Sequence, residues 1–281
     1  MLFRSNPFYQ IYEGAALLAG SRPWFLNCTA SNGYLPDFAA VPDNIWNRCA
    51  LLYICSPGNP TGAVMNLEQL KHVIELSQRH DFIIASDECY SEIYLDGDSP
   101  PPGLLQAACA LGLDQFDRCI AFNSLSKRSN LPGMRSGFVA GDSAILERFL
   151  KYRTYHGSAM PVHHQLLSTL AWQDDRHVED NRALYSRKFY AVRQILEPVW
   201  PMPMPDAGFY FWPETPVPDT EMAVRLIRRA NVKVLPGSFL SRDTESGNPG
   251  DNHVRIALVA TEDECIEAAN RIVEAWPTLL A

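Results

Sequence analysis

The sequence has no uninterrupted apolar run of the roughly 18 residues that a membrane-spanning helix requires. Its first residues show no apolar stretch behind a basic start, so we expect no secretory signal peptide. Basic residues are in deficit, because 24 Lys and Arg face 32 Asp and Glu and the formal net charge is −8. An acidic chain without a local basic patch repels phosphate backbones, so we expect neither a nucleic-acid nor a membrane partner.

The cysteines form no CxxC pair. The seven are odd in number and widely spaced, unlike a disulfide framework or a zinc cage. We therefore expect reduced thiols, no metal site and a cytoplasmic location. With 281 residues, of which 47% are apolar and 20% charged, the chain can bury at least one sizeable core. This composition excludes the fibrous, disordered and disulfide-miniprotein classes.

Strands and helices alternate in the first half of the sequence. Residues 51–55 form a short apolar run that ends in Ser-Pro-Gly, as expected of a strand buried on both faces. Asn66 then begins a helix, with Gln69 placed as its capping-box partner. Further strands are predicted at residues 82–86, 119–122 and 138–140. This alternation predicts an α/β fold with a mostly parallel sheet between helices.

The second half has a different pattern. Residues 144–155 and 162–196 predict long helices, and a cluster of prolines ends the second of them. Later strands are predicted at 207–212, 232–235 and 253–259, with a final helix at 262–275. The aromatic side chains within 207–212 are expected in a core, although one of them could face a substrate. We therefore predict a large domain at residues 1–175 and a smaller α+β domain at 176–281.

Lys127 lies just after the strand at 119–122, in the sequence Ser-Leu-Ser-Lys-Arg. Open α/β sheets bind ligands at the carboxyl ends of their strands. One interpretation is therefore a Schiff-base lysine, with Ser124, Ser126 and Arg135 around a phosphate group. The other interpretation is a solvated lysine in a polar loop, since short motifs often occur by chance.

Asp87 ends the preceding strand and also has two interpretations. It could cap the start of a helix, or it could pair with a protonated pyridine nitrogen in a pyridoxal-phosphate enzyme. The turn at residues 56–62, Ser-Pro-Gly-Asn-Pro-Thr-Gly, is typical of a tight chain reversal. It lacks the Gly-Lys-Ser/Thr of a P-loop, which excludes that kind of phosphate site.

Asn59, Asp87 and Lys127 thus follow successive strands, 28 and then 40 residues apart. This order and spacing resemble the fold-type-I pyridoxal-phosphate aminotransferases of class I/II. The resemblance covers nearly the whole chain, through Pro-Gly-Asn-Pro-Thr-Gly, Ser-Asp-Glu-x-Tyr, Ser-Leu-Ser-Lys-Arg-Ser-Asn-Leu-Pro-Gly-Met-Arg-Ser-Gly and a late Val-Arg-Ile. It implies a mostly parallel sheet sandwiched by helices in an incomplete large domain, with a smaller C-terminal α+β domain.

The resemblance also implies a role for each motif residue. Lys127 would bind pyridoxal phosphate as a Schiff base and serve as the catalytic base, while Asp87 would pair with the pyridinium nitrogen. Asn59 and Tyr90 would hydrogen-bond the phenolic oxygen of the ring, with Tyr90 also in the catalytic set. The other implied contacts are Tyr9 stacked on the ring, Ser124, Ser126 and Arg135 at the phosphate, and Arg255 with Asn59 at the substrate carboxylate.

Residues 6–15 and 152–160 resemble bacterial N-succinyldiaminopimelate aminotransferases of lysine biosynthesis. The implied reaction transfers an amino group between glutamate/2-oxoglutarate and N-succinyl-2-amino-6-oxopimelate/N-succinyl-diaminopimelate, in a homodimer. Other members of the group share the cofactor residues, so an aspartate or aromatic aminotransferase and a C–S β-lyase are alternatives. A non-catalytic, cofactor-binding fragment is a further alternative.

Members of this family carry a further segment ahead of the Asn-Pro-Phe-Tyr motif at residues 6–9. That segment supplies a phosphate-binding turn at a helix N-terminus, together with substrate and dimer contacts. We therefore expect this chain to be a fragment that binds the cofactor more weakly than a complete enzyme.

Overall fold

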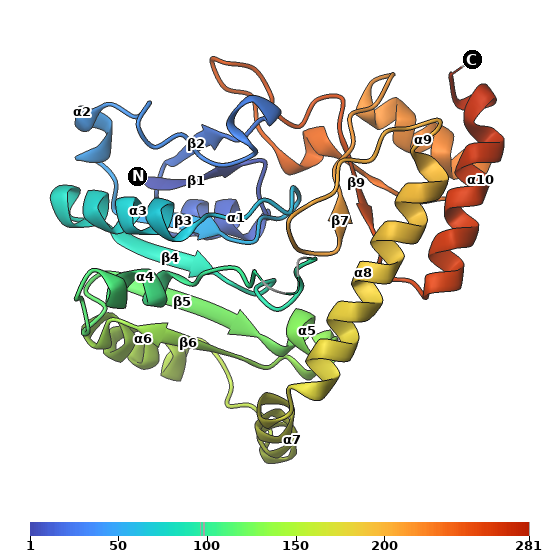
Figure 1. Cartoon of the computed structure of the whole chain (residues 1–281). Helices are drawn as coiled ribbons and strands as arrows, with labels where there is room; N and C mark the ends of the chain where they lie inside the picture. Colours follow the sequence, from blue (N-terminus) through green and yellow to red (C-terminus); the bar gives the residue numbers. More distant parts are fainter. Residues whose placement is uncertain (96, 98, 281) are drawn as a thin grey trace.

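The structure, a computed structural model, describes residues 1–95, 97 and 99–280 (Figure 1). Within these residues the larger sheet has six strands in the order β2-β1-β3-β4-β5-β6. The strands are β1 (Leu2–Asn6), β2 (Pro23–Asn27), β3 (Leu51–Cys55), β4 (Ile83–Asp87), β5 (Cys119–Ser124) and β6 (Gly137–Gly141). The first five in this order run parallel, and β6 runs antiparallel to β5. The predicted α/β fold with a mostly parallel sheet is confirmed.

Helices connect most of these strands. They are α1 (Ile11–Leu18), α2 (Asp43–Trp46), α3 (Leu67–His80), α4 (Leu104–Ala110), α5 (Leu125–Arg128), α6 (Ser143–Tyr155) and α7 (Val162–Gln173), with short 3₁₀ turns at Ala30–Asn32 and Pro132–Met134. In Figure 1, α3 and α4 lie in front of the sheet. Leu70 of α3 and Leu104 of α4 are buried in one cluster with Leu52 of β3 and Ile84 of β4, which fixes both helices on the sheet. In the part of the chain described, no helix combines the length and apolarity that crossing a bilayer demands.

The start of α3 follows the predicted capping box. The Asn66 side chain accepts a hydrogen bond from the Gln69 backbone N–H at 2.9 Å, and the Gln69 side chain accepts one from the Asn66 N–H at 2.9 Å. Two backbone donors that the helix leaves unpaired are thereby satisfied. The strand β3 before this turn has the predicted bounds.

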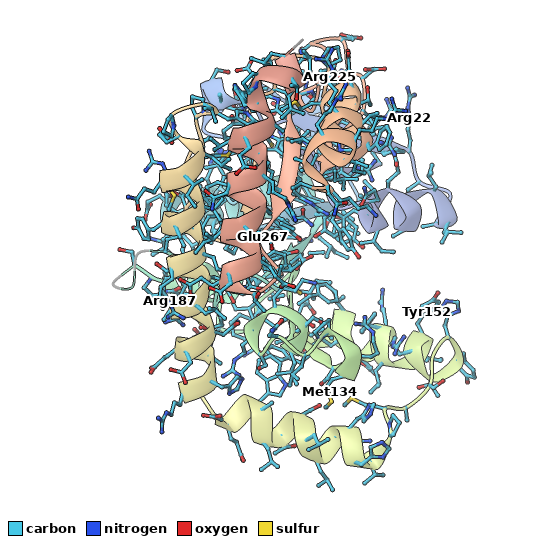
Figure 2. The ribbon with its side chains drawn as sticks, turned by 90° about the vertical axis from the view of Figure 1, so that its right-hand side faces the viewer. Arg22, Met134, Tyr152, Arg187, Arg225 and Glu267 are labelled. Carbon is cyan, nitrogen blue, oxygen red and sulfur yellow. The ribbon has the colours of Figure 1, made fainter. Side chains whose placement is uncertain are left out.

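The second half of the chain surrounds a smaller antiparallel sheet in the order β7-β9-β8. Its elements are α8 (Arg176–Leu196), β7 (Tyr210–Phe211), α9 (Asp219–Ala230), β8 (Leu235–Pro236), a 3₁₀ turn (Gly237–Leu240), β9 (Val254–Ala257) and α10 (Glu262–Leu280). Phe189 of α8, Phe211 of β7 and Ile272 of α10 share one buried cluster. Figure 2 shows α8 and α10, marked by Arg187 and Glu267, as neighbouring helices. The domain boundary at 175/176 stays a prediction.

The structure departs from the predicted elements in several places, among them the strand predicted at 232–235, which forms at Leu235–Pro236 as β8. The strand at 138–140 is antiparallel rather than part of a parallel crossover. The predicted helix at 162–196 is divided in two, because the Asp174 side chain accepts the Arg176 backbone N–H at 3.0 Å and starts a new helix there. The strand predicted at 207–212 shortens to two residues, and the last helix continues past Pro277.

Candidate active site

The carboxyl ends of β3, β4 and β5 lie side by side at one edge of the larger sheet (Figure 1). The register pairs Cys55 of β3 with Asp87 of β4, and Asp87 with Phe122 of β5. The turn that contains Asn59 follows β3, and Lys127 lies in α5, which follows β5 without a gap. The parallel sheet therefore gathers the three motifs at the edge where α/β proteins bind ligands.

Asp87 is held by two donors. Its Oδ1 accepts the Cys89 backbone N–H at 3.1 Å, and its Oδ2 accepts the hydroxyl of Tyr12. The Tyr12 ring is buried and stacks on Tyr53, with centroids 4.8 Å apart and planes 17° apart. Burial raises the pKa of Tyr12 well above its usual value, and the Asp87 charge adds to the rise. Tyr12 therefore keeps its proton and donates it to Asp87. Asp87 does not cap a helix, because the next helix among the described residues starts only at Leu104.

Lys127 lies in the single turn of α5. Ser124 caps this turn, since its Oγ accepts the Ser126 backbone N–H at 3.1 Å and lies 2.9 Å from the Ser126 hydroxyl. Lys127 is half-buried, unlike a freely solvated loop lysine, and its Nζ lies 5.6 Å from the centroid of the Tyr90 ring. The two serine hydroxyls therefore lie at the start of the same turn that carries the amine.

The pKa of the Cys55 thiol is affected by both charged groups of the site, Asp87 and Lys127. Burial raises its pKa, the Asp87 carboxylate raises it further, and the Lys127 ammonium opposes the rise. The thiol of Cys89 responds to the same two charges in the same directions. These directions agree with the placement of Asp87 and Lys127 at the ends of the neighbouring strands β4 and β5.

Two residues from the smaller sheet complete this edge. Arg255 of β9 donates from Nη1 to Asn59 Oδ1 at 2.8 Å, and its Cζ lies 4.5 Å from the centroid of the Tyr210 ring. The hydroxyls of Tyr210 and Tyr90 are 2.9 Å apart. Burial raises the pKa of Tyr90 far above its usual value, and Tyr210 adds to the rise. Tyr90 therefore keeps its proton throughout the neutral range.

Two of the predicted contacts lie at the periphery. Tyr9 is 45% exposed, and its ring meets Tyr12 edge-on, with centroids 5.9 Å apart. Arg135 is exposed, and its Nη1 donates to the Pro132 carbonyl at 2.6 Å. The backbone beside it does reach the site, because the Ser136 carbonyl accepts the Leu125 N–H at 3.1 Å.

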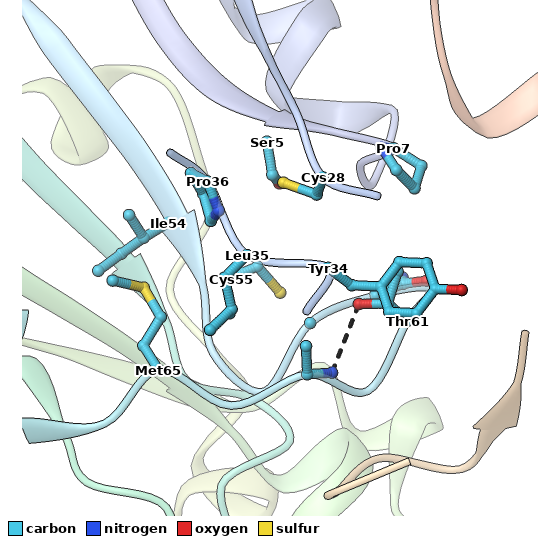
Figure 3. Close-up of a pocket in the computed structure, with 13 residues that line it drawn as sticks. Ser5, Pro7, Cys28, Tyr34, Leu35, Pro36, Ile54, Cys55, Thr61 and Met65 are labelled. Carbon is cyan, nitrogen blue, oxygen red and sulfur yellow. Dashed lines mark hydrogen bonds between the residues drawn. The ribbon is translucent and has the colours of Figure 1, made fainter. Parts of the chain in front are cut away.

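A small cavity lies behind the Asn59 turn (Figure 3). Its volume is about 20 Å³, and Tyr34, Cys55 and Thr61 are among its walls. The Thr61 hydroxyl accepts the Ala63 backbone N–H at 3.4 Å, the bond drawn in Figure 3. A space of this size holds about one water molecule, so it does not accommodate a ring-shaped ligand.

Two site residues were not predicted as such. Tyr12 belongs to the stretch at residues 6–15, but its spacing gave no sign that it would reach Asp87 across 75 positions. Tyr210 was expected in the core of the smaller domain, and it is buried, with 6% exposed. Its hydroxyl nevertheless meets Tyr90 at the site. A Tyr among Phe neighbours was the one available signal, because a buried phenol needs a hydrogen-bond partner.

The fold and this strand edge define a class of protein. Residues 2–272 match the family model of aminotransferase class I and II, and the chain belongs to this family. The enzymes of this family use pyridoxal phosphate as their cofactor.

Individual relatives narrow the comparison. An aminotransferase from Neisseria meningitidis, known from a crystal structure, has 51% sequence identity to this chain and a TM-score of 0.92. The match covers 98% of this chain and 70% of that chain. A probable N-succinyldiaminopimelate aminotransferase from Thermus thermophilus is 28% identical with a TM-score of 0.86, covering 98% and 71%. The LL-diaminopimelate aminotransferase of Moorella thermoacetica is 32% identical over 273 residues, which are 95% of this chain and 66% of the relative. The chain thus spans 66–71% of the length of these three proteins.

The donor set at the strand edge fits pyridoxal phosphate. The amine of Lys127 and the carboxylate of Asp87 follow neighbouring strands, as a ligand with a ring aldehyde and a ring nitrogen requires. The Tyr90 hydroxyl and the Asn59 amide offer donors for a phenolic oxygen, and two serine hydroxyls at the start of α5 suit a phosphate.

Proposed function

We propose that this chain is an aminotransferase that moves an amino group between glutamate/2-oxoglutarate and N-succinyl-2-amino-6-oxopimelate/N-succinyl-diaminopimelate. The observation that supports it most is the register of the parallel strands, which places Asp87 at the end of β4 between the ends of β3 and β5 that lead to Asn59 and Lys127, beside the Arg255–Asn59 contact. The substrate is supported by the printed name of the Thermus relative. We also propose a cytoplasmic homodimer with a domain boundary at 175/176.

In this proposal the side chains at the strand edge share the contacts with the cofactor. Asp87 pairs with the pyridine nitrogen, and Tyr12 holds its other oxygen in place. Ser124, Ser126 and Arg135 bind the phosphate, and Tyr9 stacks on the ring. Tyr90 and Asn59 donate to the phenolic oxygen. When bound, pyridoxal phosphate supplies an electron sink for the negative charge that forms at the substrate Cα.

The substrate acid is bound by Arg255. Its planar guanidinium offers two parallel donors, which match a carboxylate. In the structure one of these donors is directed to Asn59 Oδ1. A bound carboxylate would draw the guanidinium toward itself, and the Asn59 amide nitrogen remains available as a donor to the ring oxygen.

Lys127 has two tasks, as covalent anchor and as proton carrier. Its Nζ would hold the cofactor and, when free, would be the base that takes up and returns the substrate's Cα proton. Its place on a helical turn capped by Ser124 fixes the Lys127 backbone at this edge of the sheet.

LL-Diaminopimelate is the second candidate substrate. The LL-diaminopimelate aminotransferases of Moorella thermoacetica and Halothermothrix orenii are each 32% identical to this chain. The two candidates differ by the succinyl group, which blocks one amine and adds a carboxylate. Parallel assays with N-succinyl-diaminopimelate and LL-diaminopimelate as amino donors therefore separate them, and the preferred substrate has the higher kcat/KM.

The Lys127→Ala variant tests the proposed function. The wild-type chain mixed with pyridoxal phosphate should develop the visible absorption of a lysine-bound cofactor, and glutamate should bleach it. Lys127→Ala should lose both responses, because Lys127 supplies the amine at the strand edge beside Asp87. Lys233→Ala, at an exposed lysine of the smaller domain, is the matched control and should behave as wild type. A pigmented and active Lys127→Ala protein would contradict the assignment.

A further inference from the structure

We propose that Tyr210 is a positioning residue that links the substrate-carboxylate site at Arg255 to the Tyr90 hydroxyl. The inference rests on the proposed function and assigns a task to a residue that the family motifs do not include. Tyr210 stands in β7, where Phe211 pairs with Ile256 of β9, so its position relative to Arg255 is fixed by the smaller sheet. Its ring is buried, with 6% exposed.

Tyr210 has a different partner at each end of its side chain. Its hydroxyl lies 2.9 Å from the Tyr90 hydroxyl, and the two rings meet edge-on with centroids 5.8 Å apart. Its ring face carries the Arg255 guanidinium, whose Cζ is 4.5 Å from the centroid. A cation over an aromatic face is attracted by the ring quadrupole, so the ring keeps Arg255 on one side of the site.

The direction of the hydrogen bond follows from proton counting. A phenol has one hydrogen to donate, and in the proposed function Tyr90 donates its hydrogen to the phenolic oxygen of the cofactor. The Tyr90 oxygen can then only accept from Tyr210, so Tyr210 must be the donor in their 2.9 Å contact. Such a chain of donors strengthens each bond in it. Tyr210 therefore orients the Tyr90 proton and makes Tyr90 a better donor.

The Arg255 charge links the hydrogen bond between Tyr210 and Tyr90 to substrate binding. Burial raises the pKa of Tyr210, and Arg255 opposes the rise. When a substrate carboxylate neutralises Arg255, the Tyr210 phenol loses this polarising charge and becomes a weaker donor to Tyr90. Carboxylate binding therefore changes the hydrogen bond from Tyr90 to the phenolic oxygen of the cofactor. The charge on that oxygen affects the pKa of the nitrogen that would join Lys127 to the cofactor.

Tyr210→Phe and Tyr210→Ala separate the two tasks. Tyr210→Phe removes the hydroxyl and keeps the ring under Arg255, whereas Tyr210→Ala removes both. Tyr185→Phe is the control, because Tyr185 is equally buried (4% exposed) and its ring stacks on Phe209 in the same cluster. The measurements are the pH midpoint of the cofactor's visible absorption change and the Kd of succinate, a dicarboxylate that carries no amine.

Tyr210→Phe should raise the pH midpoint by about 0.5–1 unit, because a weaker donor leaves more negative charge on the ring oxygen. Its succinate Kd should stay within about twofold of wild type. Tyr210→Ala should show the same midpoint shift and also weaken succinate about three- to tenfold, the effect of a lost cation–ring contact. Tyr185→Phe should leave both values unchanged.

A double-mutant cycle in the cofactor-free protein provides a second readout. Tyr90→Phe and Tyr210→Phe should be non-additive by about three- to tenfold in the unfolding equilibrium constant, as expected of two residues that share one hydrogen bond. Additive effects would overturn the inference, as would a wild-type midpoint in Tyr210→Phe or an equal shift in Tyr185→Phe. If the wild-type chain binds no cofactor, the proposed function fails and this inference fails with it. Normal cofactor binding without a midpoint shift rejects only the inference.

Discussion

At the scale of single residues, the site depends on buried phenols. Tyr12, Tyr90 and Tyr210 are each at most 6% exposed, and each has its hydroxyl on another polar group of the site. A buried hydroxyl without a partner costs free energy, so these contacts stabilise the fold as well as arrange donors. The rings alone would fill the same space, and only the hydroxyls give it a defined chemistry.

The Tyr12→Phe substitution tests whether the hydrogen bond from the Tyr12 hydroxyl to Asp87 stabilises the fold. It should lower the free energy of unfolding of the cofactor-free protein by about 1–2 kcal/mol, because a carboxylate loses a buried donor. Urea unfolding measures the change. Tyr53→Phe, in the ring that stacks on Tyr12, should cost less. Equal losses in the two variants would mean that the hydroxyl of Tyr12 contributes no more than any phenol in this stack.

At the scale of elements, local signals decide where helices and strands begin. The capping box of α3 depends on two side chains three residues apart, and it formed as predicted. The break between α7 and α8 has a comparable local cause in Asp174, yet it was not predicted. Asp side chains bond nearby backbone N–H groups at helix starts and in turns, but many Asp residues lie elsewhere in the chain, so the bond made by Asp174 becomes visible only in three dimensions.

The Asn66→Ala substitution tests the capping box. It should lower the free energy of unfolding by about 1 kcal/mol, because the Gln69 N–H loses its acceptor at the helix start. Asn66→Asp keeps an acceptor oxygen at this position and should lie within about 0.5 kcal/mol of wild type. Chemical denaturation of the three proteins gives the comparison. Indistinguishable Ala and wild-type proteins would show that packing alone fixes this helix end.

At the scale of the whole molecule, a charged cluster joins distant parts of the chain. Glu13 of α1 pairs with Arg4 of β1 at 3.1 Å and with Arg242, in the loop after the 3₁₀ turn at Gly237–Leu240. Arg4 is fully buried against the rings of Phe8 and Phe25, and burial lowers its pKa to about 10 despite the opposing effect of Glu13. One carboxylate therefore compensates two guanidinium groups from the two halves of the sequence.

The Glu13→Gln substitution should destabilise the protein by roughly 2–4 kcal/mol, because it leaves the buried Arg4 charge without its counter-ion. Glu68→Gln removes a carboxylate from the exposed pair with Lys71 and should cost less than about 1 kcal/mol. Thermal and urea unfolding of both variants measure the difference. Similar small losses in the two would mean that the aromatic rings around Arg4 suffice to hold it.

The sequence by itself determined the alternation of strands and helices, the start of α3 and the order of Asn59, Asp87 and Lys127 along the strand ends. These features depend on patterns within a few residues, and a parallel sheet brings its strand ends together whatever the details of packing. Tertiary structure alone decided that Tyr12 meets Asp87, that Tyr210 meets Tyr90 across 120 positions, and that Arg255 meets Asn59 across 196. Such contacts form only when separate hydrophobic cores have packed, so no local pattern in the chain specifies them.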